Sequence, residues 1–333
     1  MFVMASTPGL RAHSIDPGRS VYGGFFPLPT PQTRGLEYPR MAKGFGITRR
    51  TFGAGGWALP FLALPHPLGA LGTATVVRDM PTAPVGLALI RQNAESNLLI
   101  GGQDGQWLLH PGTSAVERAP WPASGRPTTA IAANEDLVAA AGAGWVQLWD
   151  RHTGQPMWDS VAVRSPRALA LTPDGTVYVT DSHTGQLIRL TKGGLGPIAS
   201  GLRRPVGLFV DGDTDAWVTE YDAGQVVYIN LKTGLIRPLV FALRGPTAVA
   251  RLNTGYLAVA EPTFGRVLFI DPKTGERTPL AGGLALAVDD LDLPTDTATG
   301  LAVDVDDTVY VACPGDRSIV RLVPDIRLKR DKR

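Results

Sequence analysis

The chain has 333 residues, of which 44% are hydrophobic and 19% charged, and its formal net charge is +2. This balance is typical of a globular protein and lacks the basic bias of nucleic-acid-binding domains, so we expect no nucleic-acid partner. A single cysteine, Cys313, excludes an internal disulfide and a metal site built from several cysteines.

The first 40 residues show no periodic hydrophobic pattern and are rich in turn-forming residues, as in GGFFPLPTPQTRG. We predict that segment 1–40 is disordered or precedes the true start of the protein. Residues 41–74 differ, because a positive region is followed by an apolar stretch and then by small residues suited to cleavage. This order of features predicts a removable export signal.

The positive region contains TRRTF at residues 48–52, which resembles the twin-arginine signal family, although Gly53 and Ala54 stand where Leu and Lys are common. The resemblance implies the twin-arginine translocase as an export partner and a periplasmic or secreted location. A permanent membrane anchor is disfavoured by Pro60, Pro65 and Pro67 within the apolar stretch. We therefore expect no stable membrane insertion after cleavage.

A unit of three short strands and two turns then repeats along the chain. Its clearest copy is PRALALTPDGTVYVTDSHTGQLIRL at residues 166–190, and a fourth strand follows at 195–200. A period of about 40 residues of this composition predicts one four-stranded antiparallel sheet per repeat. The units open at Pro84, Pro127, Pro166, Pro205, Pro246 and Ala298.

Six such units predict an all-β fold, a six-bladed β-propeller over residues 75–326. The last unit lacks a convincing fourth strand, while an unassigned strand at 74–78 precedes the first unit. We predict that this N-terminal strand completes the sixth blade and closes the ring, which removes the exposed sheet edges. Residues 327–333 form a predicted basic tail.

The elements P-x-x-L-x-L, VYVTD and GQLIRL of unit 166–190 resemble those of NHL-type six-bladed propellers and their gluconolactonase-like and lyase relatives, over residues 75–323. The resemblance to the lactonases implies a metal held by an early Glu, two Asn and an Asp just before the Gly of the late repeat. Here the first unit begins Ala83-Pro84, and Thr299 stands before Gly300, so these ligands are missing at the matching positions. One further segment, LWDRHTGQPMW at 148–158, is similar to a repeat of quinoprotein propellers. A fold of this kind hosts many functions, so the resemblance does not decide among them.

Acidic residues recur at one position of the repeat. Fifteen residues after each opening, three successive units carry Asp181, Glu220 and Glu261, and the last carries Cys313. The start of the first strand and the end of the second meet at one face of a propeller, so we expect a carboxylate arc at the channel mouth. Carboxylate oxygens bind divalent cations, which predicts a calcium, magnesium or zinc site.

The carboxylates also have two other interpretations. Without a metal, neighbouring like charges suit one of them to general acid or base work. Alternatively they are structural, accept hydrogen bonds from the next turn and are neutralised by the arginines. Cys313 is expected to be a small buried residue, because no histidine is placed to activate it as a nucleophile.

Basic and aromatic residues are expected around the same mouth, where a ligand is most often bound in this architecture. They come from the loops before the unit openings and from the turns between second and third strands. The candidate ligand-binding residues are Arg126, Arg164, Arg203, Arg204, Arg244, His183 and Tyr221.

Three functions stay open at this point. The first is an exported propeller that binds a small molecule or a protein partner at the channel mouth. The alternative is a metal-dependent hydrolase, resembling the lactonases, or a lyase that uses the carboxylate arc. A quinone-dependent dehydrogenase is the third, and it needs more Trp-bearing units than the chain has.

Overall fold

The computed structural model describes residues 62–63, 72–77, 79–92, 95–120, 125–192, 194–286 and 300–324. All of them belong to the second of the chain's two compact units, Gly56–Arg333. Segment 1–40, most of the predicted signal peptide and the tail 327–333 lie outside the described residues. Within the described part, no helix is long and apolar enough to cross a membrane.

The repeat predicted from residues 166–190 forms one antiparallel sheet, with its strands in sequence order. Its inner strand is β10 (Pro166–Leu171), followed outward by β11 (Val177–Asp181), β12 (Gln186–Thr191) and β13 (Gly194–Ser200). Pro166 pairs with Asp181 across the first two strands. The start of the inner strand and the end of the second strand therefore share a face, as predicted.

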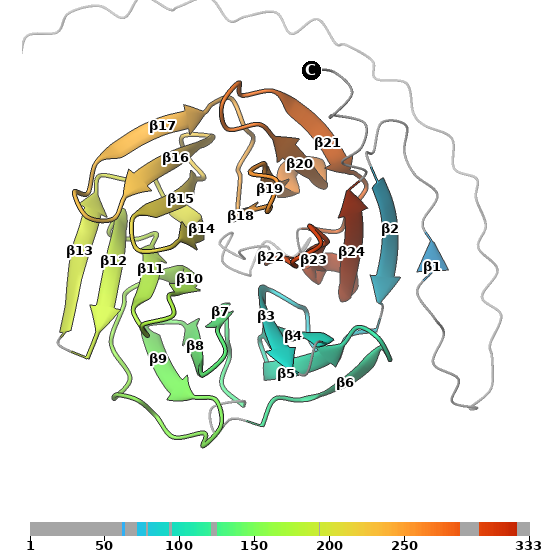
Figure 1. Ribbon diagram of the computed structural model, residues 1–333, viewed down its shortest axis with the longest axis horizontal. Coiled ribbons are helices and arrows are strands. Elements are labelled where there is room, and N and C mark those ends of the chain that lie inside the picture. Colours follow the sequence, from blue (N-terminus) through green and yellow to red (C-terminus); the bar gives the residue numbers. More distant parts are fainter. Residues whose placement is uncertain are drawn as a thin grey trace, which may run out of the picture. The chain divides into compact units, whose positions relative to one another are not determined.

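Six sheets of this kind surround a central channel, and β3, β7, β10, β14, β18 and β22 face it (Figure 1). The six-bladed propeller predicted from the sequence is confirmed. In blade 2 the fourth-strand position is held by isolated bridges, Val146 to Val161 and Trp149 to Pro156. Blade 1 contains β3 (Gly86–Gln92), β4 (Glu95–Gly102), β5 (Gly105–His110) and β6 (Ala115–Arg118); blade 2 contains β7 (Ala130–Ala133), β8 (Leu137–Gly142) and β9 (Trp145–Asp150).

Blade 3 is the sheet β10 to β13, and the remaining blades complete the ring (Figure 1). Two short 3-10 helices, η1 (Pro262–Phe264) and η2 (Pro314–Asp316), follow second strands. Blade 4 contains β14 (Pro205–Asp211), β15 (Asp215–Glu220), β16 (Gln225–Asn230) and β17 (Ile236–Val240); blade 5 contains β18 (Ala248–Arg251), β19 (Leu257–Glu261), β20 (Arg266–Ile270) and β21 (Arg277–Ala281); blade 6 contains β22 (Leu301–Val303), β23 (Val309–Cys313) and β24 (Ser318–Pro324).

The N-terminal strand closes the ring. Strand β2 (Gly72–Val77) pairs antiparallel with β24, with Val76 opposite Val320, and so supplies the fourth strand of blade 6. It begins two residues earlier than residue 74, the predicted start. A two-residue strand, β1 (Leu62–Ala63), pairs with β2 on its outer side.

Both faces of each sheet are buried, which explains the nearly continuous apolar strands. In β11, Val177 and Val179 pack into a cluster with blade 2, whereas Tyr178 packs into the cluster shared with blade 4. Inner strands approach one another closely at glycines. A Cβ on Gly207 would lie 2.7 Å from Ala248 Cα in the next blade, and one on Gly300 would lie 2.6 Å from Leu87 N.

The ring has an upper face and a lower face. The upper face carries the loops between blades and the turns after second strands, including Asp181. The lower face carries the turns between first and second strands, including Asp174, and the turns between third and fourth strands. His110 ends a third strand and His152 follows one, so both lie at the lower face.

Candidate functional site

The three aligned carboxylates lie at the same level of successive blades, but they are buried. Asp181, Glu220 and Glu261 are 2%, 4% and 0% exposed. None of them lines either cavity along the channel. The expectation of an open carboxylate arc at the mouth is therefore corrected, because second strands stand one strand away from the axis.

Each carboxylate fastens a loop to its own blade. Glu220 Oε1 accepts a hydrogen bond from the backbone N–H of Arg203 over 2.5 Å. Glu261 Oε1 accepts from the N–H of Arg244 over 2.6 Å. Both contacts are structural, but their donors come from the loop before the blade and not, as the sequence had indicated, from the next turn.

The second oxygens of the two glutamates also have partners. Glu220 Oε2 accepts from the Gln225 side chain, and Glu261 Oε2 accepts from Nε of Arg266 over 2.7 Å. In the part of the chain that the structure describes, no group of three His, Cys, Asp or Glu side chains is arranged to hold a metal. The predicted calcium, magnesium or zinc ion stays an untested prediction.

Cys313 occupies the same level in blade 6 and is buried. Burial, with the nearby carboxylate of Asp316, raises the pKa of its thiol to about 12. The thiol is therefore protonated at neutral pH and unsuited to nucleophilic attack.

The channel itself is narrow at the upper face and lined mainly by small or apolar residues of the inner strands. Its upper cavity has a volume of about 60 Å³. Arg167 is the one charged residue among those that line this cavity. Its Nε donates to Ser182 Oγ over 2.9 Å.

A larger polar pocket, of about 410 Å³, opens on the upper face at the junction of blades 3 and 4. It shares no lining residue with the channel cavities. Two of the predicted ligand-binding residues, His183 and Arg204, lie in it. The pocket is lined by Ser165, Ser182, His183, Thr184, Gly185, Leu202, Arg204 and Asp222.

Arg204 has a left-handed backbone, with φ of 53°. The same position in the next blade, before the opening Pro246, is Gly245 with φ of 56°. The guanidinium of Arg204 lies 4.6 Å from the centre of the Tyr221 ring and 3.4 Å from Asp222 Oδ1. Tyr221 in turn fills the space beside Gly245. A Cβ added to Gly245 would lie 2.9 Å from the Tyr221 ring. Tyr221 therefore positions Arg204 without lining the pocket.

The other wall of the pocket is held by Asp181. Its Oδ1 accepts from the backbone N–H groups of His183 over 3.0 Å and of Thr184 over 3.3 Å. Ser182 Oγ is 3.0 Å from Ser165 Oγ, so two hydroxyl groups lie together at the edge. The buried carboxylate thus shapes the turn that presents His183 and the hydroxyl groups.

The structure does not gather the remaining predicted arginines into this pocket. Arg126 lies 4.0 Å over the Trp145 ring in blade 2. Arg164, Arg203 and Arg244 are exposed in separate loops between blades. Sequence reasoning missed Ser165 and Thr184 as lining residues, although Ser165 directly precedes an opening proline and matches Arg204 in the repeat.

No family model matches the chain, and no curated protein matches it by sequence. Solved structures do match. A gluconolactonase from Xanthomonas campestris is 16% identical, with a TM-score of 0.56 over 80% of this chain and 95% of that one. The six-bladed β-propeller is the fold they share.

Two further propellers are similar at comparable levels. A virginiamycin B lyase from Staphylococcus aureus, solved with quinupristin, is 14% identical, with a TM-score of 0.54 over 75% of this chain and 98% of that one. An auxiliary nutrient-binding protein from Bacteroides thetaiotaomicron is 12% identical, with a TM-score of 0.54 over 76% and 69% of the two chains. Proteins this distant have the fold in common, while their functions differ from one another.

Proposed function

We propose that this chain is an exported propeller that binds a small anionic ligand in the upper-face pocket between blades 3 and 4. Export is inferred from the leader at residues 41–74. The observation that carries the binding proposal is Arg204, whose guanidinium borders a polar, solvent-open pocket of about 410 Å³. This volume lies in the range of small-molecule sites, roughly 300–1,000 Å³.

The backbone of Arg204 supports a role for its side chain. A non-glycine residue in the left-handed region costs about 1 kcal/mol or more, and such residues gather at ligand sites. The next blade has Gly245 at the equivalent position with nearly the same φ, so the loop conformation itself does not need an arginine. The stacking on Tyr221 and the contact with Asp222 hold the guanidinium in one orientation at the pocket wall.

The lining indicates the chemistry of the ligand. A guanidinium is suited to a carboxylate or phosphate, because its planar N–H groups match two oxygens. The hydroxyl groups of Ser165 and Ser182 and the imidazole of His183 add further hydrogen-bonding groups. Asp222 only accepts hydrogen bonds when ionised, so a ligand with hydroxyl groups beside its anionic group fits best. A hydroxylated organic acid meets these requirements.

The test uses the exported, processed protein and isothermal titration calorimetry with gluconate, galacturonate, citrate and inorganic phosphate. We expect at least one of these probes to bind, and Arg204→Gly to weaken that binding about tenfold or more. Glycine is tolerated at this backbone conformation, so stability should change by less than about 1 kcal/mol. The matched control is Arg203→Gln, an exposed neighbour that does not line the pocket. Failure of every probe to bind, or unchanged affinity in Arg204→Gly, would overturn the proposal.

Hydrolase or lyase chemistry stays the alternative prediction from the sequence. It is separated from binding by elemental analysis of protein purified without chelators or added metal. One tightly held divalent cation per chain, lost in Glu220→Gln, would favour the alternative. Metal-free protein that still binds one of the four probes would favour the binding function.

A further inference from the structure

The lower half of the channel is a cavity of about 260 Å³ that opens at the lower face. Successive residues of the six inner strands line it, and their side chains are apolar with the exception of Arg251. Several of them, including Leu89, Leu171 and Val303, are only half-buried. A wall of this kind favours an apolar body over water, because burial removes hydrocarbon surface from solvent.

One aromatic side chain contributes to this wall. Phe209 lines the cavity and is half-buried. Its ring lies 5.8 Å from Trp217, which meets the Tyr228 ring edge to face and has the guanidinium of Arg251 over its own face. The ring face of a fixed aromatic residue attracts organic cations.

Carboxylates surround the lower mouth of the cavity. The turns that join inner strands to second strands are directly continuous with the lining residues, and those of blades 2, 3, 4 and 6 carry exposed or half-exposed acidic groups. A hydrogen bond from the Thr172 hydroxyl keeps the pKa of Asp174 below its ordinary value, so this group is ionised at neutral pH. The carboxylates are Glu135, Asp136, Asp174, Asp211, Asp213, Asp304 and Asp306.

Cationic side chains neutralise only part of this rim. Asp211 pairs with Arg251, and Asp213 lies 3.2 Å from Lys232. Arg151 interacts with Glu135 and Asp136, and Arg321 interacts with Asp306. Seven rim carboxylates thus face four Arg or Lys side chains, so negative charge exceeds positive charge among these described residues.

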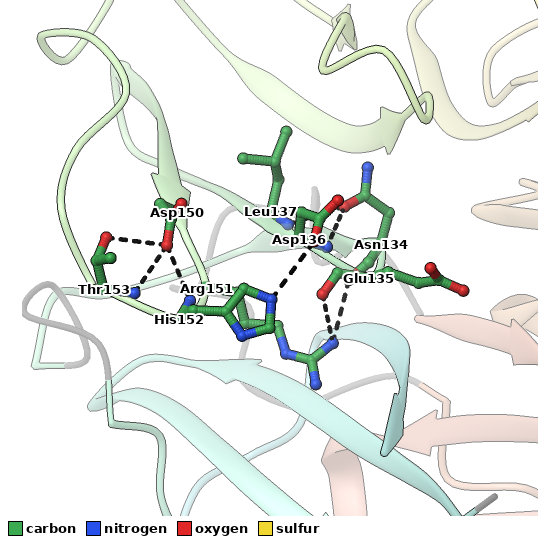
Figure 2. A network of polar contacts seen from close by, with 8 residues as sticks. All are labelled: Asn134, Glu135, Asp136, Leu137, Asp150, Arg151, His152 and Thr153. Carbon is green, nitrogen blue, oxygen red and sulfur yellow. Dashed lines mark hydrogen bonds and ion pairs between the residues drawn. The ribbon is translucent and has the colours of Figure 1, made fainter. Parts of the chain in front are cut away.

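The turn of blade 2 illustrates how a rim carboxylate is presented (Figure 2). Arg151 donates to the backbone carbonyl oxygens of Asn134 over 3.3 Å and of Glu135 over 3.0 Å. Asn134 Oδ1 accepts from the N–H of Leu137 over 2.8 Å and closes the turn. The side chain of Glu135 points away from this network (Figure 2). Its charge can thus be changed without removing a hydrogen bond of the turn, although the charge also acts on Arg151.

We propose that the lower channel cavity binds a small amphipathic organic cation, with its apolar body between the inner strands and its ammonium group at the acidic rim. Apolar burial supplies the attraction for the body, while the rim and the Phe209 ring select positive charge. Arg251 also lines the lower cavity, but it pairs with Asp211 and lies over the Trp217 ring, so the preference for a cation rests on the other carboxylates of the rim. The proposed function assigns the opposite preference to the upper-face pocket. One ring would then hold two sites of opposite charge preference, one on each face.

The test compares three probes of similar size by isothermal titration calorimetry at low salt: 2-phenylethylammonium, the neutral 3-phenylpropanol and the anion 3-phenylpropionate. We expect the cation to bind about tenfold more tightly than the anion, with the alcohol between them, and the difference to shrink as salt screens the rim. Equal binding of cation and anion, or no binding of the cation, would overturn the proposal.

Two variants locate the site. Ala133→Phe places a ring at the cavity wall and should abolish binding of both the cation and the alcohol, provided that thermal unfolding shows a folded protein. Glu135→Lys keeps the cavity and should weaken binding of the cation about threefold, with the alcohol unaffected. The matched control is Glu276→Lys, the same change on an outer lower-face turn of blade 5. If Glu135→Lys and Glu276→Lys behave alike, the rim does not select the ligand and the proposal fails.

The two sites can be tested independently of each other. Arg204→Gly should leave binding of 2-phenylethylammonium unchanged, and Ala133→Phe should leave any anion binding at the upper face unchanged. Loss of cation binding in Arg204→Gly would place the cation in the upper pocket and overturn the lower-channel proposal, whatever the outcome for anions.

Discussion

The backbone N–H of Arg203 donates to Oε1 of Glu220 over 2.5 Å, and this contact joins the loop between blades 3 and 4 to the end of β15. The equivalent contact in blade 5 joins Arg244 to Glu261. Because the carboxylates are almost fully buried, their removal would leave a backbone donor without a partner. The acidic position of the repeat thus has a structural effect that can be measured.

Glu220→Ala should lower the free energy of unfolding by about 1–3 kcal/mol, since a hydrogen bond to a buried charged acceptor is lost. Urea unfolding followed by tryptophan fluorescence measures the change. Asp222→Ala is the control, because Asp222 is exposed two residues further on, and it should cost less than about 0.5 kcal/mol. Equal losses in the two variants would show that the buried contact contributes little.

Close contact between inner strands gives a second prediction. A methyl group on Gly207 would lie 2.7 Å from Ala248 Cα and 2.9 Å from Thr247 O, both in blade 5. Gly207→Ala should therefore destabilise the ring by about 1–3 kcal/mol, because blades 4 and 5 must move apart. Gly196→Ala is the matched control, since nothing lies within 4 Å of its added Cβ. Thermal unfolding of the two variants should differ clearly, and similar midpoints would contradict the packing argument.

The sequence repeat was enough to predict the fold. The position of a residue within its repeat was not enough to predict whether its side chain lies in the site. VYVTD and GQLIRL fix the strands of blade 3 to within a residue, and the missing fourth strand of the last unit indicates the role of β2. The level of Asp181 and Glu220 was correct, but their burial depends on second strands lying away from the axis.

The pocket depends on features that a sequence pattern does not show. Ser165 and Arg204 occupy the same position before an opening proline, but of the two only Arg204 has a positive φ. That conformation brings its guanidinium over Tyr221 and toward the turn of blade 3. The Arg126, Arg203 and Arg244 side chains have the same sequence signal as Arg204 but lie outside the pocket.

Cys313 provides a pH-dependent prediction. Burial raises the pKa of its thiol to about 12 in the folded protein, above the value of about 8.5 for an exposed thiol. The neutral thiol is favoured in the folded state, so its contribution to stability is complete below about pH 8.5 and is lost as the pH rises toward 12. Urea midpoints should fall more steeply between pH 8 and pH 10.5, roughly, in the wild type than in Cys313→Ala. Parallel pH profiles for the two proteins would contradict this assignment.

The role of β2 in closing the ring can be tested by substitutions on each of its two faces. Val76 is 5% exposed and packs into a cluster with Phe269 and Leu280 of blade 5. Val76→Asp should lower the free energy of unfolding by about 3 kcal/mol or more, because a charge would be buried without a partner.

The adjacent Thr75 has a buried hydroxyl without a hydrogen-bond partner among the described residues. Thr75→Val should therefore leave stability equal or raise it by about 1 kcal/mol. If Val76→Asp unfolds at the wild-type urea midpoint, β2 does not contribute to closure.

Export is the prediction that links the leader to this ring. Arg49 and Arg50 belong to TRRTF, and the predicted cleavage region at residues 70–74 overlaps the start of β2. Cleavage within this region should leave at least residues 75–77 of β2 in the mature protein, so that blade 6 keeps the second half of its fourth strand. Replacement of both arginines by lysine should hold the protein in the cytoplasm with its leader uncleaved, because the translocase recognises the arginine pair. Cell fractionation and N-terminal sequencing measure both outcomes. A variant with its twin arginines replaced that still reaches the periplasm would exclude this route, and cleavage after residue 77 would leave the ring without its closing strand.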